Sequence, residues 1–301
     1  MPTVTQPPTT SKPQTPDAPP PEPQWRSVAR RFAKHRLAVS GLAVLLLLAI
    51  AVYVGPLVSP YAFDANDLAH AGQWRPSVGH WLGTDELGRD VLTRLLYAGR
   101  ISMTVGILVA LIGVVIGTLV GAFAGYFGSW ADAVAMRLVD VIQSVPLLML
   151  LMVLVAFLGR DLSVIVPVIA LTSWTGVARL VRAEILSLKQ QEFVEAARAV
   201  GVGHMGLIFK HLIPNALAPV FVAATLGVAD AITLESALSF LGVGIQPPTP
   251  SWGNLLTDAQ QYLIMTPWLA FYPGLLIFLT VASINFVGDG LRDALDPKLK
   301  R

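Results

Sequence analysis

A charged segment in the second half of the chain reads Glu192-Phe193-Val194-Glu195-Ala196-Ala197-Arg198-Ala199-Val200-Gly201, followed by Ile208-Phe209-Lys210-His211-Leu212-Ile213-Pro214. Long apolar runs flank it on both sides. Charged side chains are costly inside a bilayer, so we expect this stretch to lie outside the hydrocarbon layer. It is called the 190–214 segment below, and its polar groups are available to a soluble partner.

The composition of the whole chain agrees with a membrane protein. Of 301 residues, 54% are hydrophobic and only 13% are charged, whereas a soluble domain carries roughly 25% charged residues. The net charge of +2 gives no support for a nucleic-acid partner. The chain has no cysteine, which excludes disulfides, thiolate metal sites and a cysteine nucleophile. Its five histidines are scattered, so we expect no metal site.

Apolar windows long enough to cross a bilayer of about 30 Å occur six times. They predict an all-α integral membrane protein with six transmembrane helices. If the N-terminus is cytoplasmic, sixteen Lys and Arg residues lie on the inner side and five on the outer side. This bias predicts cytoplasmic N- and C-termini and a cytoplasmic 190–214 segment. The windows are 37–58, 101–126, 134–158, 162–185, 215–243 and 267–289.

The chain divides into four parts by composition. Residues 1–24 contain nine prolines and are predicted to form a disordered cytoplasmic tail. Residues 25–99 hold the first span and a long outer loop, and residues 100–290 hold the other five spans. Residues 291–301 form a short cytoplasmic C-terminal tail.

The end of the outer loop has the composition of a helix start. Thr84 is a candidate N-cap, and Asp85 and Glu86 follow it where acidic side chains favour the helix dipole. We therefore predict an amphipathic helix at the outer surface, before the second span. Its apolar face would contain Leu87, Val91 and Leu95, with Asp90 and Arg94 four residues apart on another face.

The second span carries glycine at every fourth position, which places four glycines on one helix face. Such a ridge allows the backbone of a second helix to approach closely. A tight crossing within the protein and a sliding surface for a moving helix are both compatible with it. The residues are Gly113, Gly117, Gly121 and Gly125.

The 190–214 segment is predicted to form two short helices. The first, over 190–200, has an apolar face made of Phe193, Ala197 and Val200. Gly201 and Gly203 end it, because glycine adopts a left-handed turn at little steric cost. The second starts near His204 and runs to the fifth span. The pair would form a stiff knob, although a simple connector or an interfacial hairpin fits the same pattern.

The spacing of this segment resembles a known motif. Glu195-Ala196-Ala197, then Gly201 after three residues and Pro214 further on, looks like the EAA motif of permease subunits of bacterial ABC importers. His211 and Ile213 depart from its short consensus. Three other stretches, residues 80–97, 238–253 and 288–297, resemble the C-type permeases of the dipeptide, oligopeptide and nickel group. Together the resemblances cover about residues 25–300.

The resemblance implies a type I ABC importer permease in the bacterial cytoplasmic membrane, with residues 100–290 as its transmembrane domain. It implies a second homologous permease, two ABC ATPase domains and an extracytoplasmic substrate-binding protein as partners, besides membrane lipid. ATP and Mg would bind to the ATPase subunits, and this chain would carry no cofactor. The 190–214 segment would be the coupling helix, with ATPase-coupling residues Glu192, Glu195, Ala196, Ala197, Arg198, Gly201 and Pro214.

The chain's own polar residues suggest no catalysis. A P-loop requires a Gly-Lys pair, and none occurs. Asp140, Asp230 and Glu235 lie in predicted spans without a nucleophile or base beside them. Glu235, near the outer end of the fifth span, could face the transport pathway, a docking surface or a neighbouring helix.

Two alternatives to peptide import remain. The same architecture could import nickel, glutathione or haem. A secondary transporter is the alternative of a different class, but such carriers usually have inverted repeats, and the sequence shows no clear internal repeat.

Overall fold

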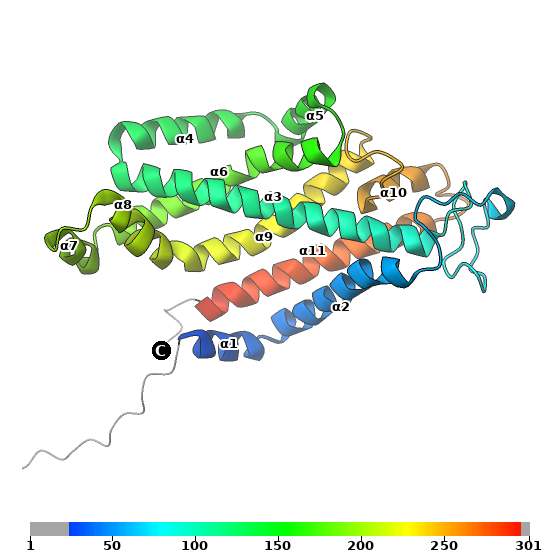
Figure 1. Ribbon diagram of the computed structural model, residues 1–301, viewed down its shortest axis with the longest axis horizontal. Coiled ribbons are helices and arrows are strands. Elements are labelled where there is room, and N and C mark those ends of the chain that lie inside the picture. The colour runs from blue at the N-terminus through cyan, green and yellow to red at the C-terminus, as the bar shows by residue number, and fades with distance from the viewer. Residues whose placement is uncertain (1–23, 296–301) are drawn as a thin grey trace, which may run out of the picture.

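The computed structural model describes residues 24–295, and the Pro-rich tail and the last six residues lie outside them. Within this range the protein is a bundle of helices without a strand (Figure 1). The helices are α1 (Gln24–Lys34), α2 (Arg36–Val58), the 3₁₀ turn η1 (Leu68–His70), α3 (Val91–Phe127), α4 (Ser129–Ser144), α5 (Leu147–Leu158), α6 (Leu162–Leu188), α7 (Glu192–Ala199), α8 (His204–Gly206), the π-helical turn η2 (Leu207–Leu212), α9 (Ile213–Phe240), α10 (Trp252–Gln260) and α11 (Trp268–Leu295).

Five continuous helical stretches are long and apolar enough to cross a membrane: α2, α3, α6, residues 204–240 and α11. They agree with five of the six predicted windows. The third window is different, because α4 and α5 form a pair bent by 88°. The sixth span exists only if this bent pair is counted as one.

The break between α4 and α5 has a local cause. Pro146 lacks a backbone N–H and crowds the residue before it, which disfavours the helical conformation there. Val145 accordingly has extended dihedral angles, with φ −94° and ψ 135°. The predicted window 134–158 therefore corresponds to two helices, the first beginning at Ser129 and the second following Pro146.

The helices α3 and α6 pack along the glycine ridge. All four ridge glycines are buried and face α6. A Cβ added to Gly117 would lie 2.6 Å from Cβ of Val177, and one added to Gly125 would lie 2.9 Å from the carbonyl oxygen of Arg182. The absence of side chains thus sets the distance between the two helices.

The outer loop does not contain the predicted amphipathic helix. Asp85 accepts hydrogen bonds from the backbone N–H groups of Leu87 and Arg89, which closes a turn instead. The helix starts only at Val91, where Asp90 is the N-cap and its carboxylate accepts from the Thr93 N–H at 2.7 Å. It then runs without interruption into the second span. Leu95, predicted to lie on the apolar face of that helix, is buried.

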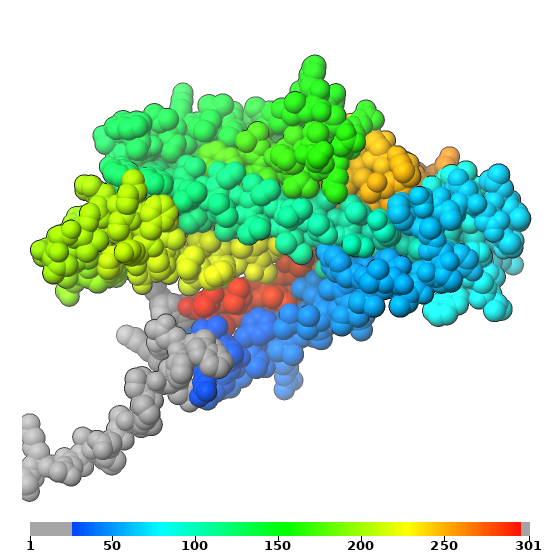
Figure 2. All heavy atoms as spheres, in the orientation of Figure 1, coloured from blue at the N-terminus to red at the C-terminus, as the bar shows by residue number. Residues whose placement is uncertain are grey.

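The bundle has two distinct ends. Figure 1 shows the outer loop and the start of α3 at one end, and α7 and α8 at the other. The space-filling view shows the yellow-green α7–α8 region projecting beyond the neighbouring helices (Figure 2). The helix α3 extends over nearly the whole length between these ends, since its 37 residues measure about 55 Å at 1.5 Å per residue.

Candidate functional site: a helical knob at one end of the bundle

The local sequence explains where the helix α7 begins and ends. Glu192 and Glu195 lie in its first turn, where negative charge favours the helix dipole. Gly201 follows the helix with φ +84°, a left-handed conformation that residues with a Cβ rarely adopt. The N–H of Val202 then donates to the carbonyl of Ala197 at 3.1 Å, which satisfies one of the last carbonyl groups.

One face of α7 is buried against the bundle. Val194 and Ala197 form it, with Phe193 half-buried beside them. The predicted face included Val200, and this was wrong: Val200 is 81% exposed. It lies one residue beyond the end of α7, where the chain already leaves the helical path.

The opposite face of α7 is open to solvent. The exposed residues of this face and of the turn after it include Glu192, Glu195, Ala196, Arg198 and Gly201. The first four lie on a helix of eight residues and Gly201 lies in the turn after it, and none of the five fills the core. This surface is the accessible part of the knob.

The second half of the knob is continuous with the next span. Helical conformation extends from His204 to Phe240, and Pro214 is an exposed residue in the first turn of α9. Proline at this position cannot donate to the carbonyl of Lys210. The preceding turn, η2, adopts π-helical geometry, which is rare and occurs mostly as a single-turn bulge within an α-helix. His211 is half-buried in that turn.

The knob is held by a mixed apolar and polar contact. Val194, Ala197 and Leu207 belong to one buried cluster with Tyr126 of α3 and Ile185 of α6. The Tyr126 hydroxyl group and Nδ1 of His204 share a hydrogen bond of 2.7 Å. Nζ of Lys189 donates to the carbonyl oxygen of Tyr126 at 3.2 Å. The base of the knob is thus fixed to the ends of α3 and α6.

Glu235 is placed inside the subunit. It has no exposed surface, and its carboxylate accepts hydrogen bonds from Oγ of Ser102 at 2.9 Å and Oγ of Ser239 at 2.7 Å. Ser102 in turn accepts from the backbone N–H of Trp252. The sequence left the pathway, a docking surface and a neighbouring helix open as the surroundings of Glu235, and this geometry is a contact with neighbouring helices. Glu235 links α9 to α3 and, through Ser102, to α10.

Asp140 of α4 has its ion-pair partner on α6. It is bound by Arg179 of α6, with Nη2 and Oδ1 2.5 Å apart. A second ion pair joins Arg182 of α6 to Asp132 of α4. These pairs hold α4 on α6 through polar contacts.

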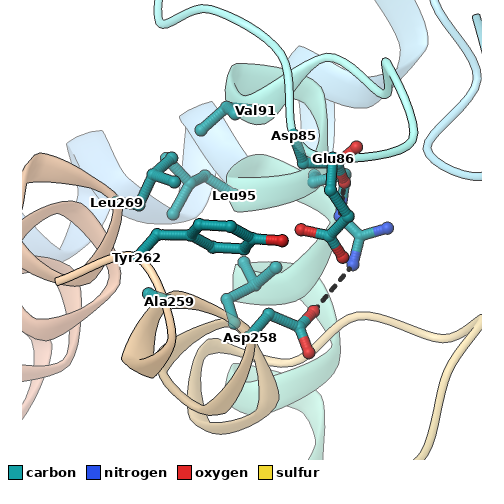
Figure 3. Close-up of a pocket in the computed structure, with 10 residues that line it drawn as sticks. Asp85, Glu86, Val91, Leu95, Asp258, Ala259, Tyr262 and Leu269 are labelled. Atoms are coloured by element: carbon teal, nitrogen blue, oxygen red, sulfur yellow. Dashed lines mark ion pairs between the residues drawn. The ribbon is translucent and has the colours of Figure 1, made fainter. Parts of the chain in front are cut away.

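A charged cluster at the opposite end closes the outer loop onto the bundle. Arg94 of α3 is 3% exposed and lies 3.6 Å from both Asp85 and Asp258, instead of pairing with Asp90. Figure 3 shows the ion pair with Asp258 and the Tyr262 hydroxyl group directed toward Glu86. Burial raises the pKa of Glu86 and of Asp258. The cluster surrounds a cavity of only about 40 Å³.

The contribution of α10 to this cluster was not visible in the sequence. Asp258 is 164 positions from Arg94, and no local pattern connects them. Tyr262 and Asp258 follow the buried Trp252, whose Nε1 donates to the carbonyl of Leu95 at 3.1 Å. A capping box formed by Ser251 and Asn254 starts α10. This pair of residues is the sequence signal from which the start of the helix could have been predicted.

A bundle of long apolar helices with a solvent-exposed helical knob is the architecture of a multi-pass membrane protein. Comparison with known proteins specifies the family. The family described as "Binding-protein-dependent transport system inner membrane component" matches residues 117–301, and the "N-terminal TM domain of oligopeptide transport permease C" matches residues 23–74. The chain belongs to this family of binding-protein-dependent transport permeases.

Several curated relatives cover nearly the whole chain. The oligopeptide transport system permease protein OppC of Escherichia coli (strain K12) is 47% identical over 276 residues, which is 91% of each chain. The dipeptide transport system permease protein DppC of Alkalihalophilus pseudofirmus is 39% identical over 95% of each chain. A putative peptide permease of Brucella suis is 45% identical over 90% of each.

A solved structure shares the fold. The inward-facing MetNI methionine ABC transporter aligns with a TM-score of 0.55 at 22% identity, covering 67% of this chain and 96% of that chain. At this identity the similarity concerns the arrangement of helices alone.

Proposed function

We propose that this chain is the permease subunit of an ATP-driven importer that moves di- or oligopeptides across the bacterial cytoplasmic membrane. The observation that carries the proposal is the 39–47% identity to OppC and DppC permeases over nine-tenths of the chain. The chain would form half of the pathway, and a second, homologous permease would form the other half.

The knob is the site proposed to receive energy from partner ATPases. Its exposed Glu192, Glu195 and Arg198 project from a stiff helix, and a rigid helix transmits a displacement that a flexible loop would absorb. Each exposed ion pair with an ATPase would contribute about 0–1 kcal/mol, so shape rather than charge would dominate the contact. ATP and Mg would bind to those subunits and hydrolysis would occur there.

This assignment also sets the orientation. With the knob in the cytoplasm, both termini are cytoplasmic, as the distribution of Lys and Arg predicts. The outer loop at the opposite end (Figure 1) would then be available to an extracytoplasmic substrate-binding protein.

The other candidate functions receive no comparable support. The three relatives described above are named as oligopeptide, dipeptide or peptide permeases. The similarity to an ABC importer fold does not favour a secondary transporter.

Copurification with candidate ATPases tests the coupling assignment. The double variant Glu195→Lys, Gly201→Pro reverses a charge on the exposed face and disrupts the turn after α7, so it should abolish ATPase association and peptide uptake. Asp64→Lys, the same charge reversal in the exposed outer loop at the opposite end, is the matched control and should retain ATPase association. Intact association in the double variant would refute the assignment.

Uptake in reconstituted vesicles tests the cargo. Labelled dipeptide and tetrapeptide should accumulate in an ATP-dependent manner, and unlabelled peptide should compete. Accumulation of nickel, glutathione or haem with no competition by peptide would exclude peptide as the cargo.

A further inference from the structure

Tyr126 is the penultimate residue of α3, and groups from three other segments converge on it. Its hydroxyl group shares the 2.7 Å hydrogen bond with His204, the first residue of α8. The guanidinium carbon of Arg198 of α7 lies 5.9 Å from the centroid of its ring, within the range of a cation–π contact. Lys189, directly after α6, donates to its carbonyl group. Tyr126 itself is only 6% exposed.

The end of α3 is firmly joined to α6. Lys189 also donates to the carbonyl of Gly125 at 3.4 Å, which places a positive charge at the negative end of the α3 dipole. Behind this contact the glycine ridge holds α3 against α6 with no space for an added Cβ at Gly117 or Gly125. A force applied at Tyr126 therefore acts on both helices together.

The two glycines that connect α7 to α8 are not packed against the rest of the described bundle. Gly201 and Gly203 lie between α7 and α8, and within the described residues no heavy atom is within 4 Å of the Cβ position of either. Glycine in open space constrains the backbone weakly. Motion of the knob is thus passed to α3 mainly by side-chain contacts, and two of these meet at Tyr126: Arg198 of α7 lies over its ring, and His204 of α8 shares the hydrogen bond of its hydroxyl group.

We propose that Tyr126 is a positioning residue that ties the knob to α3, so that its hydroxyl group sets how tightly ATP hydrolysis is coupled to transport. The inference rests on the proposed function. Tyr126 is buried and does not contact the ATPase. It holds the angle between the knob and a helix that reaches the opposite end of the bundle.

The test uses the full transporter in proteoliposomes and counts peptides transported per ATP hydrolysed. Tyr126→Phe keeps the ring and removes the hydrogen bond to His204. We expect normal assembly with the ATPases and a transport-to-ATP ratio reduced roughly threefold to fivefold, the factor that one hydrogen bond commonly exerts on an equilibrium. Tyr53→Phe is the matched control, because it removes a hydroxyl contact with Thr104 between α2 and α3. Its ratio should not change.

A substitution at His204, the partner of Tyr126 in this hydrogen bond, gives an independent variant. His204→Ala removes the same contact without altering α3 and should lower the ratio as much as Tyr126→Phe. The double variant should be no worse than either single variant, because both remove one interaction. His204→Gln keeps a hydrogen-bonding side chain and should restore part of the ratio.

A distance measurement separates a positioning role from a general loss of stability. Because the chain has no cysteine, two introduced cysteines at the exposed Ala199 of α7 and Leu119 of α3 accept spin labels uniquely. Tyr126→Phe and His204→Ala should broaden the distance distribution, and Tyr53→Phe should not. An assembled Tyr126→Phe or His204→Ala transporter with unchanged ratio and distribution overturns this inference. A wild-type chain that binds no ATPase overturns the proposed function instead.

Discussion

Oγ of Ser102 on α3 donates a hydrogen bond of 2.9 Å to the carboxylate of Glu235 on α9, and neither residue has any exposed surface. Ser239 donates to the second carboxylate oxygen at 2.7 Å. The interaction joins residues 133 positions apart, close to the point where α10 packs on both helices. A buried polar group that loses its partners destabilises the fold, so this group has a structural function.

Replacement of Glu235 by alanine should therefore lower stability by about 1–3 kcal/mol, because two buried serine hydroxyl groups lose their acceptor. Glu235→Gln keeps one acceptor oxygen and should cost less. Thermal unfolding of the purified subunit in detergent measures both. Wild-type stability of Glu235→Ala, together with a loss of transport, would instead place this residue in the pathway.

The glycine ridge makes a second prediction. Alanine at Gly117 would place its Cβ 2.6 Å from that of Val177 and force α3 away from α6, at a cost of about 1–3 kcal/mol. Gly176→Ala on α6 is the matched control, since no neighbouring heavy atom of the described chain lies within 4 Å there. It should be neutral or slightly stabilising, because alanine is the better helix former. Equal unfolding temperatures for the two variants would contradict the conclusion that the glycine ridge sets the distance between α3 and α6.

The turn after α7 allows a comparison between two glycines only two residues apart. Gly201 has φ +84°, whereas Gly203 has φ −70°. Both have open space around the Cβ position. Gly201→Ala should cost roughly 1–2 kcal/mol through backbone strain alone, and Gly203→Ala should cost almost nothing. Limited proteolysis of the segment after α7 would detect the difference, and similar cleavage rates would show that φ at Gly201 is not constrained.

The outer cluster predicts a dependence of stability on pH. Burial raises the pKa of Asp258 above its usual value of 3.8, so the folded protein binds this proton more tightly than the unfolded chain. The contribution of Asp258 to stability therefore falls as pH rises from 3.8 through its raised pKa. Asp258→Asn should remove this contribution. Hydrogen exchange of residues 85–95 across this pH range measures the contribution of Asp258 to stability. Identical pH profiles for the wild-type protein and Asp258→Asn would rule this contribution out.

The elements that the sequence predicted best are those with a strong local signal. The long apolar windows correspond to α2, α3, α6, α9 and α11, and Gly201 ended α7 as expected. Their formation depends on burial and on backbone conformation within a few residues. The helix over 190–200 was placed correctly, although its buried face was shifted because Val200 lies beyond the last helical residue.

The errors arose where a few hydrogen bonds or one proline outweighed a regular pattern. Pro146 divided an apolar window whose hydrophobicity alone indicated one helix. Asp85 closed a turn where acidic residues had suggested a helix start. The partners of Arg94 could not be predicted, because Asp258 is brought there by the packing of α10 and not by local sequence.

Site-specific crosslinking tests most directly whether α7 receives the ATPase. A photoreactive residue at the exposed Ala196 of α7 in the assembled transporter should crosslink to the ATPase subunit. The same residue at Met265, which is 80% exposed and lies after α10, should not. A crosslink to the ATPase from Met265 and none from Ala196 would contradict the account.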